Sequence, residues 1–225
     1  MKLTRLRGSI EFWDAFAPWY EKWLLRGTYH TPVIREVGKM VEPGWRALDI
    51  GAGTGVLSIP MSSLGCTVDA LEPSRGMRAI LDQKLSSLDV GSVTTLDVRW
   101  EDFEATQERP FDLIVACNSL HLTRGGIMGG MKKVFSARPD FICLVTEINQ
   151  DIFIDFKEVN SLQDSYTFLS IMTYRTDSSF HFDDMDEVAD LGKFAGIPIH
   201  VEMVEGRPVQ SDDTEVAVLW WERRG

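Results

Sequence analysis

The chain of 225 residues is 44% hydrophobic, which provides enough apolar material for one domain with a sizeable core. It contains 23 lysines and arginines against 34 aspartates and glutamates, a formal net charge of −11 at pH 7. Because affinity for nucleic acids comes mostly from cationic contacts with phosphates, this charge disfavours a nucleic-acid partner.

The sequence also argues against membrane insertion and metal binding. It has no run of 18 or more apolar residues, and residues 1–7 lack the apolar core and cleavage site of a secretion signal. We therefore expect a soluble cytoplasmic protein without a membrane partner. Cys66, Cys117 and Cys143 are odd in number and lack CxxC spacing, and no histidines cluster, so we expect neither disulfides nor a metal site.

In chain order, the first distinctive segment is residues 12–23, which is densely aromatic. Residues 151–190 form a second segment rich in aromatic side chains. We expect both to supply loops and added helices at the carboxyl edge of a sheet, where open α/β folds bind ligands. Most of these aromatic side chains are expected to fill an ordinary helical core.

An apolar strand that contains Asp49 leads into a turn with alternate glycines at Gly51, Gly53 and Gly55. Glycine is needed where the backbone takes a positive φ or where a ligand approaches the main chain. Residues 56–59 are apolar and can open a helix whose free N–H groups face that ligand. A strand-to-helix turn with purely structural glycines would have the same pattern.

The next segment, residues 66–72, predicts a second short strand. Its last residue, Glu72, falls 21 residues after Gly51, where a βαβ unit places an acid on ribose hydroxyls. A surface glutamate at the end of a strand is the alternative, but the preceding glycine turn favours the ribose contact.

The spacing of the turn indicates which ligand carries that ribose. Dinucleotide folds use GxGxxG to bring a helix N-terminus to a pyrophosphate, whereas the spacing here is GxGxG. Asp49 lies two residues before Gly51, and an acid at this place disfavours a phosphate and favours a cation. A ligand with a ribose at one end and an ammonium or sulfonium group at the other satisfies both the ribose contact and the acid at Asp49. S-adenosylmethionine is that ligand.

The remaining elements alternate between helices and apolar strands. We expect a helix from residue 74 to about 88, strands at 93–98 and 111–117, a helix within 125–136 and a strand at 141–145. Such alternation predicts a parallel sheet covered on both faces. Residues 197–204 and 215–222, separated by a turn with Gly206 and Pro208, predict an antiparallel hairpin.

Four motifs in this order resemble the class I S-adenosylmethionine-dependent methyltransferases, namely residues 48–55, 71–74, 99–103 and 111–121. The resemblance extends over roughly residues 45–150. It implies one α/β domain, residues 1–225, built on a doubly wound, seven-stranded, mostly parallel sheet of order 3-2-1-4-5-7-6 with helices on both faces. We expect a helical lid at 1–44, a cofactor-binding core at 45–150, an acceptor-side insertion at 151–195 and an antiparallel C-terminal hairpin at 196–225.

The resemblance also implies how individual residues bind S-adenosylmethionine. The backbone at Gly51 and Gly53 would hold the methionyl part, with Asp49 near its amino group. Glu72 would bind the ribose hydroxyls. Asn118, after the fourth strand, would position groups at the same site.

The adenine end of the cofactor is expected after the third strand. The family reads the adenine amino edge there with an acid and a neighbouring backbone N–H, which fall on Glu101 and Trp100. A shift of one residue in the alignment would make Asp102 the reader instead. Met77 would pack near the adenine, although a methionine on a helix is more often simple core filling.

The family often closes an N-terminal helical lid over its cofactor. In this chain Trp19, Tyr20 and His30 are candidates for that contact, and we assign Tyr20 to the cofactor-binding set. Packing in an ordinary helical core is the alternative for each of the three.

Methyl transfer from a sulfonium is an in-line displacement on carbon, so the protein mainly aligns acceptor, methyl and sulfur in a water-poor cavity. An acceptor that must lose a proton also needs a general base. His121 is our catalytic candidate, because it follows the fourth strand at the sheet edge and the ordinary pKa of histidine suits proton transfer near neutral pH. A hydrogen-bonded structural histidine is the alternative.

The sequence favours a small-molecule methyl acceptor. Residues 118–121 are not the Asn/Asp-Pro-Pro-aromatic signature of exocyclic-amine methylation in DNA, and no proline precedes Cys117 or Cys143, as a C5-pyrimidine nucleophile would require. Two other functions stay open. One is a non-catalytic S-adenosylmethionine-binding protein, and the other is a nicotinamide-dinucleotide oxidoreductase, which the glycine spacing and Asp49 disfavour.

Overall fold

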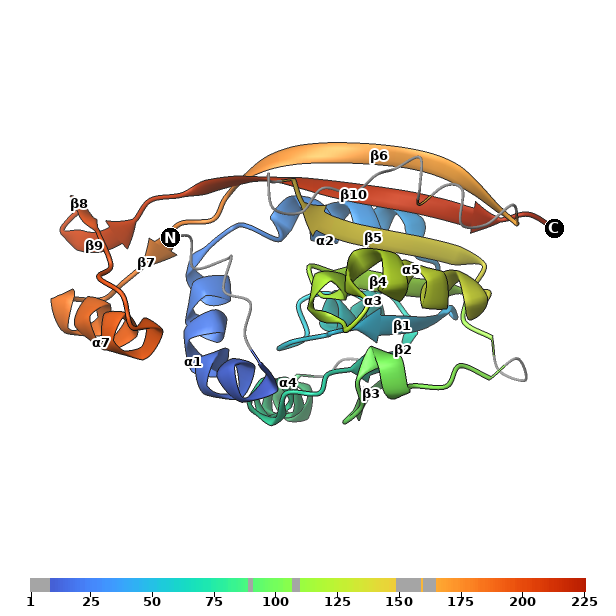
Figure 1. The fold of residues 1–225 in the computed structure, drawn as a ribbon, viewed down its shortest axis with the longest axis horizontal. Coiled ribbons are helices and arrows are strands. Elements are labelled where there is room, and N and C mark those ends of the chain that lie inside the picture. Colours follow the sequence, from blue (N-terminus) through green and yellow to red (C-terminus); the bar gives the residue numbers. More distant parts are fainter. Residues whose placement is uncertain (1–8, 89–90, 107–109, 149–158, 160–164) are drawn as a thin grey trace.

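The computed structural model describes residues 9–88, 91–106, 110–148, 159 and 165–225 (Figure 1). A seven-stranded sheet forms its centre. In spatial order the strands are β3 (Val93–Leu96), β2 (Thr67–Leu71), β1 (Arg46–Ile50), β4 (Leu113–Cys117), β5 (Phe141–Glu147), β10 (Asp213–Arg223) and β6 (Tyr166–Asp177). The first five are parallel, and β10 runs antiparallel to both β5 and β6. The expected doubly wound sheet, with its last strand in sequence inserted next to the edge, is confirmed.

Alternate residues of the central strands face opposite sides of the sheet, and each side carries its own core. Ala47 and Val115 belong to a core shared with α1 (Ile10–Arg26), α2 (Thr31–Met40), α3 (Ser58–Ser63) and α7 (Met185–Ala195). Leu48 and Ile114 belong to the core under α5 (Gly126–Ser136). Since both sides are covered, the inner strands are apolar along nearly their whole length.

The C-terminal strand pairs differently from the predicted hairpin. β10 forms its outer ladder with β6, which lies in the segment that we expected to be an acceptor-side insertion. Of residues 197–204, only Glu202–Val204 are a strand, β8, and they belong to a separate three-stranded sheet with β9 (Arg207–Gln210) and β7 (Phe180–His181). The prediction that 197–204 is the partner of 215–222 was therefore wrong.

The reason for this pairing is visible in the length and burial of the strands. β10 has 11 residues and is buried along most of its length, so it requires a partner of similar length on each side. β6 has 12 residues and pairs along β10 from Asp213 to Arg223, whereas β8 has three residues, all exposed. The aromatic residues of β6 were interpreted as added helices, although their alternation is that of an edge strand.

Helix α1 is docked on α4 (Arg75–Ser87) through close backbone contact. Asp14 Oδ1 accepts hydrogen bonds from Ser74 Oγ at 2.6 Å and from Gly76 N at 3.0 Å. A Cβ on Gly76 would lie 2.3 Å from the Asp14 carbonyl oxygen. About two helical turns further along, Lys84 forms an ion pair with Glu21 at 2.7 Å. The absence of a side chain at residue 76 thus permits the two helices to touch.

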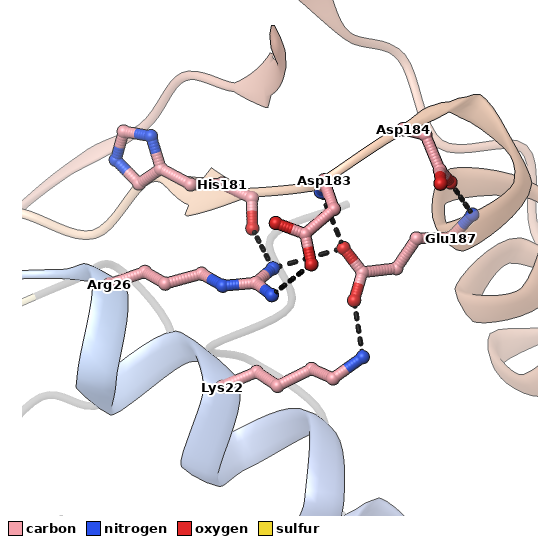
Figure 2. Close-up of polar contacts among 6 residues, drawn as sticks. All are labelled: Lys22, Arg26, His181, Asp183, Asp184 and Glu187. Atoms are coloured by element: carbon pink, nitrogen blue, oxygen red, sulfur yellow. Dashed lines mark hydrogen bonds and ion pairs between the residues drawn. The ribbon is translucent and has the colours of Figure 1, made fainter.

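The opposite side of α1 is fastened to the segment around α7, as Figure 2 shows. Arg26 Nη1 donates to the His181 carbonyl oxygen at 2.9 Å and pairs with Glu187 at 3.0 Å, and Arg26 Nη2 pairs with Asp183 at 2.6 Å. Lys22 also pairs with Glu187, which is buried. Burial raises the pKa of Glu187, but the hydrogen bonds from Lys22, the Asp183 backbone and Arg26 outweigh it and lower the pKa. The carboxylate is therefore held ionised between two cations of the helix.

We predict that Gly76→Ala destabilises the protein by about 1–3 kcal/mol, the cost of forcing a methyl group into closely packed backbone. Hydrogen exchange should become faster in α1, because that helix must move away from α4. Gly38→Ala is the matched control, since a Cβ there would meet only Leu64 Cδ1 at 3.5 Å. Equal thermal stability and equal exchange in both variants would contradict the proposed helix contact.

Candidate active site

A cavity of about 770 Å³ lies at the carboxyl edge of the sheet and has α1 as one wall. This volume is typical of pockets that enclose a small molecule or cofactor. Seven groups of residues form the wall. They are residues 9–11 at the start of α1; the α1 aromatics Trp13, Phe16, Tyr20 and Trp23; the pair Tyr29 and His30; the turn after β1; residues 71–74 with Met77; residues 98–101; and residues 117–119 with 121–124, Glu147 and Phe180. Most of the predicted site residues are therefore gathered in one place.

The glycine turn combines structural and ligand-facing positions. Gly51, Gly53 and Gly55 all have positive φ, at 69°, 57° and 90°. A Cβ on Gly51 would lie 2.4 Å from Ser119 Cβ, so packing requires a glycine there. A Cβ on Gly55 would lie 2.4 Å from Leu81 Cδ1, the end of a flexible side chain, so the positive φ is the stronger reason for glycine at that position. At Gly53 the nearest atom to a Cβ would be Tyr20 Cε1 at 3.6 Å. Gly53 is thus the position where missing side-chain atoms leave room beside the cavity.

Glu72 connects the glycine turn to the start of α4. Its two carboxylate oxygens accept hydrogen bonds from Gly53 N and Ser74 N, each at 2.8 Å. The residue is 7% exposed, and its pKa is raised because burial outweighs these two backbone hydrogen bonds. Each oxygen keeps a second lone pair, so the carboxylate can also accept hydrogen bonds from hydroxyl groups in the cavity.

Asp49 lies behind the wall of the cavity rather than on it. It is 2% exposed and accepts a hydrogen bond from Ser58 Oγ at 2.6 Å. Burial raises its pKa to about 6. Its charge is still felt in the cavity, because it contributes to raising the pKa values of Tyr20 and Cys117, for which burial is the main cause. Asp49 therefore acts on this space through its electric field.

The residues expected at the adenine end lie on the wall, and two of their side chains form hydrogen bonds to the protein backbone. Trp100 is buried and its indole Nε1 donates to the Gly130 carbonyl oxygen at 3.2 Å. Glu101 Oε1 accepts from Arg124 N at 2.6 Å. Met77 is buried and also lines the cavity. Asp102, the alternative reader of adenine, is not a wall residue.

A hydrogen-bonded group of three residues closes the part of the cavity at the ends of β4 and β5. Asn118, with a φ of 50°, donates from Nδ2 to the Tyr29 hydroxyl at 2.8 Å and accepts from Glu147 N at 3.1 Å. The Tyr29 hydroxyl donates to Glu147 Oε1 at 2.9 Å. No sequence motif indicates Tyr29 or Glu147 as a site residue. Glu147 could have been found as the acid that ends the fifth strand, next to the strand that leads to Asn118.

The histidine candidate and two of the three lid candidates lie on the cavity wall. His121 lies in a 3₁₀ turn (Leu120–Leu122) on the cavity wall, directly after β4. Tyr20 and His30 are also wall residues, whereas Trp19 is not. His30 is 6% exposed, and burial lowers its pKa to about 3, so its imidazole is neutral near pH 7. Its Nδ1 is buried and has no hydrogen-bond partner within the described part of the chain.

Among the described residues, Cys66, Cys117 and Cys143 are free thiols, and no group of three or more histidine, cysteine or acidic side chains could hold a metal ion. Burial raises the pKa of all three thiols. No helix within the described ranges is long and apolar enough to cross a membrane.

The raised pKa of Asp49 predicts a pH-dependent stability. An aspartate that titrates near 4 when unfolded and at about 6 when folded contributes stability below pH 4 that is lost as the pH rises through 6. Asp49→Asn keeps an acceptor for Ser58 and abolishes this loss. Relative to the unmodified protein, the free energy of unfolding of the variant should rise by up to about 3 kcal/mol between pH 4 and pH 7. Urea unfolding at several pH values measures it, and parallel pH profiles would refute the assignment.

Comparison with known proteins places this site in a family. The sequence model of a family described as a methyltransferase domain matches residues 48–137, which include the glycine turn, Glu72 and Asn118. An uncharacterized methyltransferase of Staphylococcus carnosus is 36% identical over 77 residues, or 34% of this chain and 33% of that protein. An uncharacterized methyltransferase of Anoxybacillus flavithermus is 28% identical over 174 residues, or 66% of this chain and 79% of that protein.

The match to the Staphylococcus protein thus spans a third of that relative's length. Among solved structures, the magnesium protoporphyrin IX methyltransferase of Synechocystis with bound S-adenosylmethionine has a TM-score of 0.56 at 12% identity, over 87% of this chain and 80% of that chain. At this identity the likeness shows a common fold. The family match identifies residues 48–137 as a methyltransferase domain, and the fold around it is that of the class I S-adenosylmethionine-dependent methyltransferases.

Proposed function

We propose that the protein transfers a methyl group from S-adenosylmethionine to a small-molecule acceptor. The observation that carries the proposal is the composition of one cavity. Gly53 and Glu72 line it beside the ends of β1 and β2, and Asn118, His121 and Glu147 line it beyond the ends of β4 and β5. A nucleoside cofactor and a second molecule can therefore meet in the same enclosed space.

The residues at the β1 and β2 ends fit S-adenosylmethionine. The space at Gly53 admits the methionyl part of the cofactor, and the remaining lone pairs of Glu72 suit the two ribose hydroxyls. Glu101, Trp100 and Met77 would surround the adenine. When bound, the cofactor supplies an electrophilic methyl group on a sulfonium.

The charge of this region favours that cofactor over a dinucleotide. Glu72 lies on the wall and Asp49 directly behind it, both in buried surroundings where charge interactions are weakly screened. A pyrophosphate at the turn would be repelled by both carboxylates, whereas an ammonium and a sulfonium would be attracted. The charge of this region therefore favours methyl transfer over the oxidoreductase alternative.

The rest of the cavity supplies alignment and proton transfer. The aromatic residues of α1 exclude water from the space beside Gly53, so that acceptor and methyl are held in line. His121 is proposed to accept a proton from the acceptor through its imidazole nitrogen. Coverage by α1, which is fastened on two sides, and the net charge of −11 favour a small molecule over a nucleic acid.

Calorimetry with S-adenosylhomocysteine tests the cofactor assignment. Binding is expected at micromolar to millimolar concentration, while a fluorescence titration with NADH should show none. Uptake of tritium-labelled methyl groups by pools of metabolites then separates an enzyme from a protein that only binds the cofactor. If a folded sample does not bind S-adenosylhomocysteine at millimolar concentration, the proposal loses its basis.

Glu72→Ala is expected to weaken S-adenosylhomocysteine binding by about 1.5–3 kcal/mol, typical of hydrogen bonds to a charged group. The structure adds a second effect, because the substitution leaves the buried amides of Gly53 and Ser74 without their acceptor. Thermal unfolding of the ligand-free variant measures that part separately. An unchanged dissociation constant in a folded variant would show that Glu72 does not bind the ribose.

His121→Ala is expected to lower turnover at least tenfold, within the range for loss of a general base, while the affinity for S-adenosylhomocysteine stays within about twofold. Turnover is measured with an acceptor found by labelled methyl uptake. His200→Ala, which changes an exposed histidine far along the chain, is the control. Equal losses of turnover and cofactor affinity would instead indicate a structural role for His121.

A further inference from the structure

The part of the cavity beyond β4 lies away from Gly53 and Glu72, where the cofactor is proposed to bind. β1, β4 and β5 are consecutive parallel neighbours in the sheet, and adjacent strands are spaced about 4.8 Å apart. Gly51 follows β1 and Glu147 ends β5, so the two are separated by about two strand spacings, roughly 10 Å. A cofactor held at Gly53 and Glu72 would leave the Glu147 end of the cavity to the acceptor.

We propose, resting on the methyl transfer proposed above, that this end of the cavity binds a cationic amine group of the acceptor, with Glu147 as its counter-charge and His30 as a second hydrogen-bond acceptor. The subsite consists of Glu147, Tyr29, His30, Asn118, Trp23 and Phe180, all of which line the cavity. Three observations support the assignment, namely the carboxylate, the imidazole and the aromatic wall.

Glu147 presents a carboxylate in a buried setting. It is 7% exposed, and it is oriented by the Tyr29 hydroxyl at Oε1 and by the bond from its own N–H to Asn118. The arginines of the cavity wall, Arg99 and Arg124, lie at the other end, where Arg124 N is bonded to Glu101. In buried surroundings charge interactions are weakly screened, so this carboxylate attracts a cationic ligand and repels a carboxylate or phosphate.

His30 supplies a polar atom that the protein itself does not satisfy. His30 lines the cavity, and its buried Nδ1 has no hydrogen-bond partner among the described residues, which is unfavourable unless a ligand or water supplies a donor. The imidazole stays neutral because burial lowers its pKa to about 3. In the tautomer that carries its proton on Nε2, Nδ1 accepts a hydrogen bond from an ammonium.

Aromatic rings complete the surroundings of the proposed ammonium. The Trp23 and Tyr29 ring centroids are 4.9 Å apart, and the Tyr29 and His30 centroids are 4.5 Å apart. A cation beside Trp23 and Tyr29 would gain from the negative faces of their rings. The Tyr29 hydroxyl donates to Glu147 and accepts from Asn118, and it keeps one lone pair toward further donors.

The experiment uses the folded protein saturated with S-adenosylhomocysteine and three probes of similar shape, namely benzylamine, benzyl alcohol and benzoate. Calorimetry should show benzylamine binding at least tenfold tighter than benzyl alcohol, with benzoate weakest. Glu147→Gln keeps an acceptor for Tyr29 and should abolish this preference, with the dissociation constant of S-adenosylhomocysteine unchanged within twofold. Glu11→Gln makes the same charge change at an exposed residue of the same wall and should retain the preference.

The ranking of the probes in the unmodified protein tests the proposal even if Glu147→Gln fails to fold. Benzoate binding as tightly as benzylamine, no binding of any probe, or an amine preference that survives Glu147→Gln would overturn it. Failure to bind S-adenosylhomocysteine would instead refute the proposed methyl transfer. The two failures are therefore distinguishable in one series of titrations.

Discussion

The bridge made by Glu72 between two backbone amides is the interaction on which the other parts of the site depend. It joins the turn at Gly53 to Ser74, the residue that caps α4. Ser74 in turn donates to Asp14 of α1. One buried carboxylate thus connects the glycine turn to the helix that forms one wall of the cavity, so the position of α1 is coupled to the geometry of the turn.

The accumulation of acids around the cavity has a cost and a consequence. Asp49, Glu72 and Glu147 are all buried, and burial alone disfavours their ionised forms. Backbone and side-chain hydrogen bonds offset part of that cost, and cationic ligands would offset more. A site of this kind selects by charge, which agrees with a sulfonium cofactor and with the proposed cationic acceptor.

Helix α1, the expected lid, shows how contacts between distant residues position a helix. The aromatic residues of α1 were expected to serve mostly as core, and many do, since Phe16 and Trp23 are buried in the core of that sheet face. The helix is nevertheless held in place by polar contacts at its rim, to α4 on one side and to α7 on the other (Figure 2). Such contacts involve residues 60 or more positions apart, which no local pattern indicates.

The sequence by itself determined the strand–turn–helix frame from β1 to β5, the positive-φ turn at Gly53 and the acid at Glu72, because these features follow from local periodicity and short spacing. Only the tertiary structure decided that β6 pairs with β10, that Asp49 lies behind the cavity wall, and that Tyr29 and His30 join Glu147. These outcomes depend on strand length, burial and packing between distant segments. A one-dimensional pattern carries the first kind of information and lacks the second.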